Sequence, residues 1–319
     1  MCISLTQQKF EIDNVNSSKL HYQLILKKFL DNLKYKKLSK GYICSNKKVL
    51  SRLLKYLRIN DISNISKITS ENIFNYILTL NRCSQNYKYN IVSKIRIFLK
   101  FMYLNNFTSR DFTLVIPKIK INHNKNIPNT VWSAGEISKI LNSIDTTTSI
   151  GKRDYAIFML LIHLGLRFSD VKKLKFDNID WQMNILNITQ SKTKKIVTLP
   201  LLENVGISII DYIKNGRPNV VSEHIFLDRK DKSFSSQFSF YHIFRKYIKL
   251  ANIDISNKKY IGTYSLRHSL ATTLLQNRTP LSTISRILGH TDINNTAIYL
   301  KVDITSLKEC CLNLEVDSL

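Results

Sequence analysis

Residues 177–199 read DNIDWQMNILNITQSKTKKIVTL, and this stretch departs from the helical patterning of the chain around it. Apolar and polar residues alternate in three short runs, 177–181, 184–189 and 195–199, and such alternation is typical of strands with one buried face. The polar run Ser191-Lys192-Thr193-Lys194 lies between the last two and predicts a turn. The stretch therefore predicts a small antiparallel β-sheet in a protein that is otherwise mainly α.

The chain before this sheet carries helical spacing. Apolar residues recur three and four apart between residues 20 and 57, with neither a proline nor a strand-like run among them. Ser39 is a candidate cap for a second helix, and Thr69 or Ser70 for a third. A fourth helix is expected from about residue 84 to residue 104. The front of the chain is thus predicted to be a four-helix domain.

Charge points to a polyanionic partner. Of the 319 residues, 48 are Lys or Arg and 23 are Asp or Glu, which gives a net charge of +25. Residues 1–125 alone hold 23 basic and six acidic residues. Nucleic acid is the first candidate, because such an excess goes beyond what solubility requires. A genome biased toward Lys, Asn and Ile codons is the alternative cause.

The predicted fourth helix interleaves aromatic and basic side chains, as a helix lying on a phosphate backbone requires. These residues are Tyr87, Lys88, Tyr89, Lys94, Arg96 and Lys100. For the aromatic ones, burial in the core is the stronger expectation.

Residues 111–130 separate two domains in the predicted organisation. Pro117 and Pro128, several lysines and weak periodicity indicate an extended linker there. Beyond it, Ser133 and Glu136 form a capping-box pattern. An apolar helix over 155–164 is then expected to end at Gly165. The predicted divisions are a tail at 1–16, a helical domain at 17–110, the linker, a second domain at 131–305 and a C-terminal tail at 306–319.

Several functional classes lack their sequence signals. The five cysteines form no CxxC pair and are odd in number, so neither a zinc site nor a disulfide framework is predicted. No run approaches the roughly 18 apolar residues of a membrane span, and the N-terminus has no apolar signal region. A P-loop and an acidic metal cluster are also missing from the pattern. We expect no metal, no cofactor, no membrane and a cytoplasmic, nucleoid-associated location.

Five short motifs carry the chemistry. They are GLRFSD at 165–170, SKT at 191–193, YSLRH at 264–268, LGH at 288–290 and finally Tyr299. In order and spacing this set resembles the tyrosine recombinases or phage integrases, of the Xer-like, mobile-element type. The resemblance covers nearly all of the second domain and, more loosely, the helical front, which is similar to the core-binding domain of that family. It implies a two-domain DNA clamp with a catalytic domain at 131–305.

Two arginines suit the charge of a phosphoryl transition state. Arg167 and Arg267 are planar guanidinium groups that stay charged at any physiological pH, and each can hold two oxygens. Arg167 follows Gly165, where a side chain can project into a cleft. His290 follows a glycine that permits a tight turn, and its imidazole can donate a hydrogen bond to phosphate.

The resemblance implies Tyr299 as the nucleophile and Lys192 as the general acid. A phenol has an ordinary pKa of about 10, so its attack near neutral pH needs positive charge or a base nearby. Lys192 lies in the predicted turn, from which an ammonium can reach the departing 5′ oxygen. By composition alone, Lys194 and Lys195 are equally plausible for that role.

Tyr264 is a departure from the family pattern. Where the family carries histidine three residues before the second arginine, this chain has a phenol, which donates a hydrogen bond but is a poorer proton acceptor near neutral pH. We still place Tyr264 in the catalytic set and expect an altered rate or pH dependence. His268 and Asp170 are expected to support the set, with Asp170 orienting Arg167 or accepting a hydrogen bond within the cluster.

By resemblance, the chain cuts and rejoins double-stranded DNA at specific sites through a 3′-phosphotyrosyl intermediate, for integration, excision or resolution. The resemblance also implies a homotetramer on two paired sites. An apolar stripe between Ile304 and Val316 suits docking of the C-terminal tail on a neighbouring subunit or on its own domain. Some members of the family carry an arm-binding module in front of the core-binding domain; because the stretch before Ser17 is short, we expect recognition of simple core sites instead. The alternatives are a catalytically impaired DNA-binding protein with the same fold and a relaxing topoisomerase.

Overall fold

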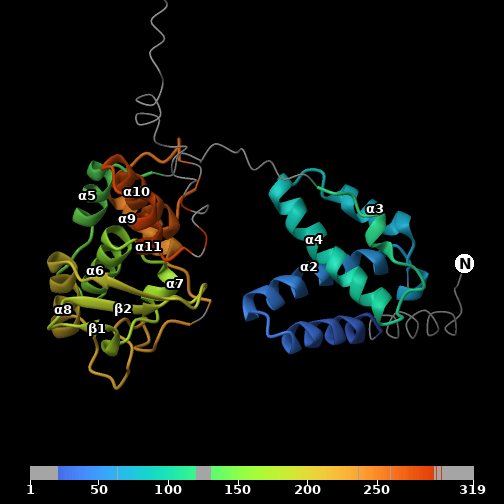
Figure 1. Ribbon diagram of the computed structural model, residues 1–319, viewed down its shortest axis with the longest axis horizontal. Coiled ribbons are helices and arrows are strands. Elements are labelled where there is room, and N and C mark those ends of the chain that lie inside the picture. The colour runs from blue at the N-terminus through green and yellow to red at the C-terminus, as the bar shows by residue number, and fades with distance from the viewer. Residues whose placement is uncertain are drawn as a thin grey trace, which may run out of the picture. The chain divides into compact units, whose positions relative to one another are not determined.

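The computed structural model describes residues 21–62, 64–119, 131–235, 237–258, 260–290, 292 and 296. The chain divides into two compact units, which we call the N-terminal unit (1–124) and the C-terminal unit (125–319). Helices dominate both, and a three-stranded antiparallel sheet lies in the C-terminal unit (Figure 1). The predicted fold class, mainly α with a small antiparallel sheet, is confirmed.

Within its described residues, 21–62 and 64–119, the N-terminal unit has four helices, and three of them have capped starts. They are residues 21–35, α2 (Lys40–Ile59), α3 (Ser70–Thr79) and α4 (Gln85–Leu104), with short 3-10 turns at Ile65–Lys67 and Phe112–Leu114. Ser39, Thr69 and Ser84 are the N-caps of α2, α3 and α4, and each side-chain oxygen accepts a hydrogen bond from the first turn of its helix. The predicted helices are therefore present close to their expected bounds.

The aromatic residues at the start of α4 are exposed. Tyr87 and Tyr89 each keep 42% of their surface accessible, whereas Phe98 and Ile95 further along the helix are fully buried. The expectation that the interleaved tyrosines belong to the core is wrong. The buried residues of α4 begin only at Ile91, so the tyrosine rings before it, at the start of the helix, are exposed to solvent.

Two basic residues of α4 bind the segment 111–117, which follows this helix in the chain. The guanidinium of Arg96 donates to the carbonyl oxygens of Ile116 and Pro117, and Lys100 forms an ion pair with Asp111 at 2.7 Å. Phe112 and Ile116 are buried in the core of the N-terminal unit. Arg96 and Lys100 thus hold the segment that follows α4, and their expected place on a phosphate backbone stays a prediction.

The C-terminal unit surrounds a buried helix with the sheet and further helices. Its elements are α5 (Ala134–Asn142), α6 (Ser149–His163), α7 (Phe168–Val171), β1 (Ile179–Asp180), β2 (Ile185–Thr189), β3 (Ile196–Pro200), α8 (Glu203–Asn215), α9 (Tyr241–Leu250), α10 (Thr263–Gln276) and α11 (Leu281–Leu288). The Ser133–Glu136 capping box is present at α5. The apolar helix begins at Ser149 rather than Tyr155, because Thr148 caps it through the amide of Gly151.

The sheet has the order β1-β2-β3, and its buried face rests on the core. Leu186 pairs with Leu199 and Ile188 with Val197, and all four side chains are buried. β1 is only two residues long, because residues 176–178 form a 3-10 turn where alternation predicted more strand. The polar run 191–194 is the turn between β2 and β3, as predicted.

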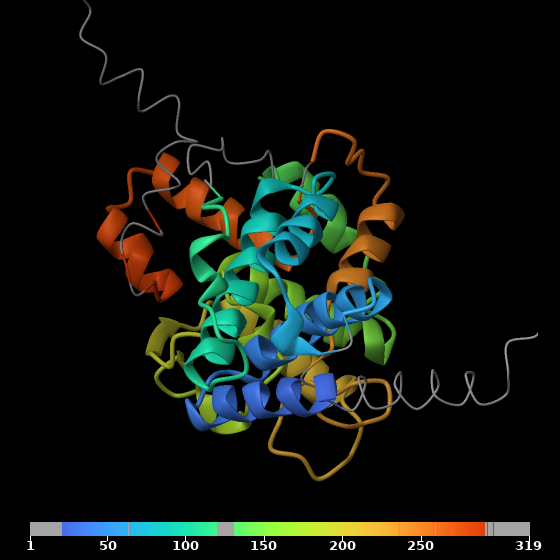
Figure 2. The same ribbon diagram turned by 90° about the vertical axis from the view of Figure 1, so that its right-hand side faces the viewer.

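α6 is the centre of the C-terminal unit. Residues 156–158, 160 and 161 have no accessible surface, and α6 packs on both α8 and α10. Its two buried charges are paired: Arg153 lies 2.7 Å from Asp154, which also accepts a hydrogen bond from the hydroxyl of Tyr247. α10 and α11 pack side by side and are drawn in orange to red (Figure 2). No helix in the described ranges combines the length and apolarity of a membrane span.

Candidate active site

Gly165 follows the C-terminal end of α6 and permits close packing against α10 and α11. Its φ is +58°, a conformation that favours glycine. A Cβ at this position would lie 2.8 Å from Leu270 of α10 and 3.2 Å from Leu288 of α11. Arg167 follows at the start of α7, and its Nη1 donates a 2.8 Å hydrogen bond to the side-chain oxygen of Gln190. The first arginine is therefore held toward the end of β2.

The β2–β3 turn is fixed at its base. The Gln190 amide donates to the carbonyl of Lys195 at 2.8 Å and closes the hairpin. The amide of Ser191 donates at 2.8 Å to the carboxylate of Asp170, a buried residue of α7. Lys192 stands at the exposed tip. The turn thus presents an ammonium group from a base that is tied to the segment carrying the first arginine.

Arg267 lies inside the unit, between two helix ends. It keeps 1% of its surface accessible. One guanidinium nitrogen donates to the carbonyl of Gly165 at 2.9 Å, and the other donates to the carbonyl of Leu288. These carbonyls lie at the C-terminal ends of α6 and α11, where the helix dipoles concentrate negative charge. The two helix ends therefore stabilise a buried cation and fix its plane.

Gly289 turns the chain after α11 and places His290. Its φ is +62°, and the next amide, that of His290, donates to the carbonyl of Ser285 at 3.0 Å. The Nδ1 of His290 lies 2.7 Å from the hydroxyl oxygen of Thr296. The turn thus sets the backbone at the imidazole, and Thr296 sets the orientation of the ring.

The electrostatics of this region favour a neutral imidazole. Burial lowers the pKa of His290 to about 4, and the positive charges of Arg267, Arg167 and Lys192 act in the same direction. A neutral ring keeps one N–H donor at neutral pH. The structure therefore brings two arginines, the turn lysine and a neutral histidine into one electropositive cluster, which suits an anionic phosphate.

The chain that carries this cluster is similar to known proteins. The family model described as "Phage integrase family" matches residues 131–305. The chain belongs to the phage integrase family.

Relatives of this family match different shares of the chain. A candidate integrase/recombinase of Sinorhizobium fredii is 31% identical over 223 residues, which are 69% of this chain and 52% of that protein. A second from the same organism is 33% identical and is covered to 53%, so the chain spans about half the length of these two relatives. A tyrosine recombinase XerD of Staphylococcus epidermidis is 27% identical over 293 residues, which are 89% of this chain and 96% of that protein.

Solved structures of the family share the fold at low sequence identity. The XerH site-specific recombinase, bound to its difH substrate in a post-cleavage complex, aligns with a TM-score of 0.70 and 19% identity over 89% of this chain and 82% of that one. A lambda integrase dimer bound to a core site aligns with a TM-score of 0.69 and 14% identity over 87% and 94%.

Tyr264 and His268 form a pair on α10, beside the cluster. Their ring centroids are 4.5 Å apart, and the rings are nearly perpendicular. Tyr264 is 53% exposed at the first turn of the helix. Burial and the neighbouring Arg267 lower the pKa of His268 to about 4. The Tyr264 phenol is thus accessible, and the His268 ring packs against it.

Gln190 is the residue of this site that sequence reasoning missed. The sequence predicts that Asp170 orients Arg167 or accepts a hydrogen bond within the cluster; Asp170 accepts one from the turn, whereas Arg167 bonds to Gln190. A signal was available. Alternate residues of a strand point to the same face, and the buried face of β2 carries Leu186 and Ile188. Gln190, directly after β2, continues this alternation, and a polar residue on the buried face needs a hydrogen-bond partner.

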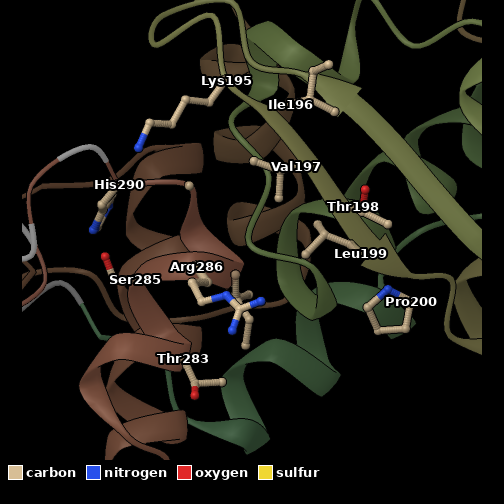
Figure 3. A pocket seen from close by; sticks show the side chains of 12 residues that line it. Lys195, Ile196, Val197, Thr198, Leu199, Pro200, Thr283, Ser285, Arg286 and His290 are labelled. Carbon is tan, nitrogen blue, oxygen red and sulfur yellow. The ribbon is translucent and has the colours of Figure 1, made fainter.

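A groove of about 590 Å³ runs beside the cluster. β3 lines one side, and α11 with the turn after it lines the other; Lys195 and His290 lie at the same end (Figure 3). Among the described residues, no three His, Cys, Asp or Glu side chains gather as a metal site requires. Tyr299 and the C-terminal tail 306–319 lie outside the described residues.

Proposed function

We propose that this chain is a site-specific DNA recombinase that cuts and rejoins DNA through a 3′-phosphotyrosyl intermediate on Tyr299. One observation carries the proposal. Arg167 and Arg267 are joined through the Gln190 side chain and the Leu288 carbonyl, and His290 follows Leu288 by two residues. A pair of fixed guanidinium groups, of which Arg267 is buried and Arg167 half-buried, suits a phosphodiester better than it suits a stable core, because burying charge is costly.

The arginines and the histidine act on the non-bridging oxygens. Transesterification builds negative charge on these oxygens, and fixed N–H donors stabilise that charge without reorganising. Arg167 and Arg267 supply guanidinium donors, and neutral His290 supplies one N–H. The same positive field favours the phenolate form of a nearby tyrosine. These three residues therefore lower the barrier for the attack of Tyr299.

The reaction exchanges one phosphoester for another. The phenolic oxygen of Tyr299 forms a bond to phosphorus as the bond from phosphorus to the 5′ oxygen breaks, and the phenol proton leaves to a base or to solvent. Lys192 donates a proton to the departing 5′ oxygen, which becomes a hydroxyl. The 5′ hydroxyl of another strand then attacks the phosphotyrosine in the reverse sense. The phosphoester energy is conserved.

The N-terminal unit supplies affinity for the duplex. Lys48, Arg52 and Lys55 are exposed on α2 and recur at four- and three-residue spacing, so they share one face. Such a row of cations matches the repeating phosphates of DNA and binds without reading sequence. Double-stranded DNA is therefore the proposed partner of both units.

Recombination between two sites requires more than one subunit. A lambda integrase of the same fold is known as a tetramer bound to a Holliday junction. We extend this to a homotetramer on two paired sites for the present chain, with the tail at 306–319 docking between subunits. The mobile-element role, rather than chromosome resolution, is part of the same proposal.

Covalent trapping tests the proposal. Purified protein is incubated with sheared genomic DNA of its host, denatured, and assayed for protein bound to DNA. The wild type is expected to form adducts, whereas Tyr299→Phe forms none and still shifts the recovered DNA in a gel. Tyr260→Phe, an exposed tyrosine of the same unit, is the matched control and should trap normally.

Other outcomes separate the alternatives. Equal trapping by Tyr299→Phe removes Tyr299 from the reaction. A wild type that shifts DNA without any adduct is a binding protein that kept the fold. Relaxation of supercoiled plasmid without a specific site indicates a topoisomerase.

A further inference from the structure

Gln190 is a buried polar residue at the point where the reactive segments meet. It keeps 2% of its surface accessible and follows directly on β2. Its backbone closes the β2–β3 turn from both sides, since its amide donates to Lys195 and its carbonyl accepts from Lys194. The side chain is therefore fixed to the base of the turn before it makes any contact of its own.

The side-chain amide uses both of its ends. The oxygen accepts hydrogen bonds from Nη1 of Arg167 and from the hydroxyl of Thr193, each at 2.8 Å. The nitrogen donates at 3.0 Å to the carbonyl of Leu288, which also accepts from Arg267. Only a carboxamide of this length offers two acceptor positions on one side and a donor on the other.

The backbone at Gly289 is shaped to receive this amide. A Cβ on Gly289 would lie 2.3 Å from the Gln190 nitrogen and 2.8 Å from its oxygen. Glycine thus permits close packing between the end of α11 and the Gln190 side chain, as well as the positive φ of the turn. His290 follows immediately, so the amide touches the backbone that places it.

We propose that Gln190 is a positioning residue that holds Arg167, the Lys192 turn and the His290 turn in register around one phosphate. The inference rests on the proposed function and deepens it. Arg167 is bonded directly, Lys192 is placed through the neighbouring Thr193, and His290 is placed through Leu288 and Gly289. Gln190 itself touches no substrate.

The role acts on rate and not on DNA affinity. Groups that must meet one phosphorus atom lose much of their effect when they shift by about 1 Å. Removing a residue that orients reactive groups costs on the order of 10- to 100-fold in activity. The binding of exposed cations to the DNA backbone does not depend on this amide, so DNA affinity is expected to persist.

Gln190→Met tests the role with little change in volume. Single-turnover cleavage is measured at saturating concentration of a DNA duplex recovered by covalent trapping, nicked so that cleavage cannot reverse. We expect cleavage slower by about 10- to 100-fold, with an unchanged dissociation constant for the same duplex. Gln182→Met, an exposed glutamine of the β1–β2 turn, is the matched control and should cleave at the wild-type rate.

Thr193→Val tests separately the hydrogen bond through which Gln190 positions Lys192. It removes only the hydroxyl that donates to Gln190 and keeps the shape of a half-buried side chain. A substrate with sulfur in place of the departing 5′ oxygen needs no proton from Lys192. This substrate should restore most of the rate of Thr193→Val but only part of the rate of Gln190→Met, because Arg167 and His290 are also displaced in the latter.

The outcomes decide between positioning and mere folding. If Gln190→Met cleaves both substrates as fast as the wild type, the inference is wrong. It is also wrong if cleavage slows equally on both substrates in both variants and follows a lowered melting temperature. If Gln190→Met fails to fold, Thr193→Val and its recovery on the sulfur substrate decide alone. A wild type that forms no adduct overturns the proposed function itself, which is a separate result.

Discussion

The cations of the two units differ in how they are held. On α2 of the N-terminal unit, Lys48, Arg52 and Lys55 are exposed, and Arg52 donates a 2.9 Å hydrogen bond to the Tyr87 hydroxyl. In the C-terminal unit, Arg267 is buried and donates to two helix ends. Exposed cations on long side chains give additive and salt-dependent attraction. Fixed cations stabilise one arrangement of charge. We infer that the first set supplies affinity and the second supplies rate.

The largest effect is expected where geometry, rather than charge, is altered. Arg267→Lys keeps the positive charge but replaces the rigid fork by a single ammonium, which cannot span both carbonyls and the phosphate. Single-turnover cleavage should fall by about 10²- to 10³-fold, as for other fixed donors to a transition state. DNA affinity, measured by gel shift, should change little.

Arg245→Lys on α9 provides the comparison, because its side chain is exposed and bonds only to Tyr241 among the described residues. It should cleave normally. If Arg267→Lys cleaves at the wild-type rate, the fixed arrangement of this cation does not determine the cleavage rate, and the proposed difference between the two sets of cations is wrong.

A smaller effect of another kind is expected on α2. The double variant Lys48→Met with Lys55→Met removes two exposed charges, so the slope of log affinity against log salt should decrease by about 0.9 for each DNA phosphate that is no longer neutralised. The cleavage rate at saturating DNA should remain that of the wild type. Lys214→Met, an exposed lysine of α8, serves as control. A slower cleavage step with an unchanged salt slope would reverse the roles of the two regions.

The smallest effect concerns stability against pH. His290 and His268 have pKa values near 4 in the folded chain, and unfolded imidazoles titrate near 6.5. Between these values the unfolded chain binds protons that the folded chain does not, so the free energy of unfolding decreases as pH falls from 6.5 to 4. Above 6.5 both forms are neutral, and the contribution is constant.

Tryptophan fluorescence can report on the unfolding of the C-terminal unit alone. Trp132 and Trp181 are the two tryptophans of the chain, and both lie in the C-terminal unit. Urea unfolding followed by tryptophan fluorescence should therefore show a loss of stability on the order of 1 kcal/mol per imidazole on acidification. His290→Asn should make this dependence less steep and leave the share of His268. An unchanged slope in His290→Asn would mean that the imidazole is not desolvated.

Local signals were sufficient for much of the fold. Capping at Ser39, Thr69 and Ser133 depends on neighbours within one helical turn, and the alternation around the β2–β3 turn marks the sheet. These features act over short distances along the chain, so the sequence displays them. The same signals could not tell that Arg96 and Lys100 fasten the segment after α4, because that interaction depends on where the chain returns.

Motif spacing predicted the candidate site residues, but it did not predict the hydrogen bonds that connect the described ones. Arg167 and Arg267 lie far apart in the sequence. No periodic pattern predicts that Gln190 bonds to Arg167 and to the Leu288 carbonyl, which also accepts from Arg267. The buried phase of β2 marks Gln190 as unusual without naming its partners. Long-range hydrogen bonds of this kind are set by the packing of α6, α10 and α11 together.

Peptide mass spectrometry of the trapped adduct tests the central claim most directly. The protein bound covalently to DNA is digested with protease and nuclease, and the residue that carries the nucleotide remnant is identified. The remnant is expected on the Tyr299 phenol, joined to a 3′ phosphate. A remnant on any other residue, or a 5′ linkage, would contradict the assembly of Arg167, Lys192, Arg267 and His290 around a phosphate attacked by Tyr299.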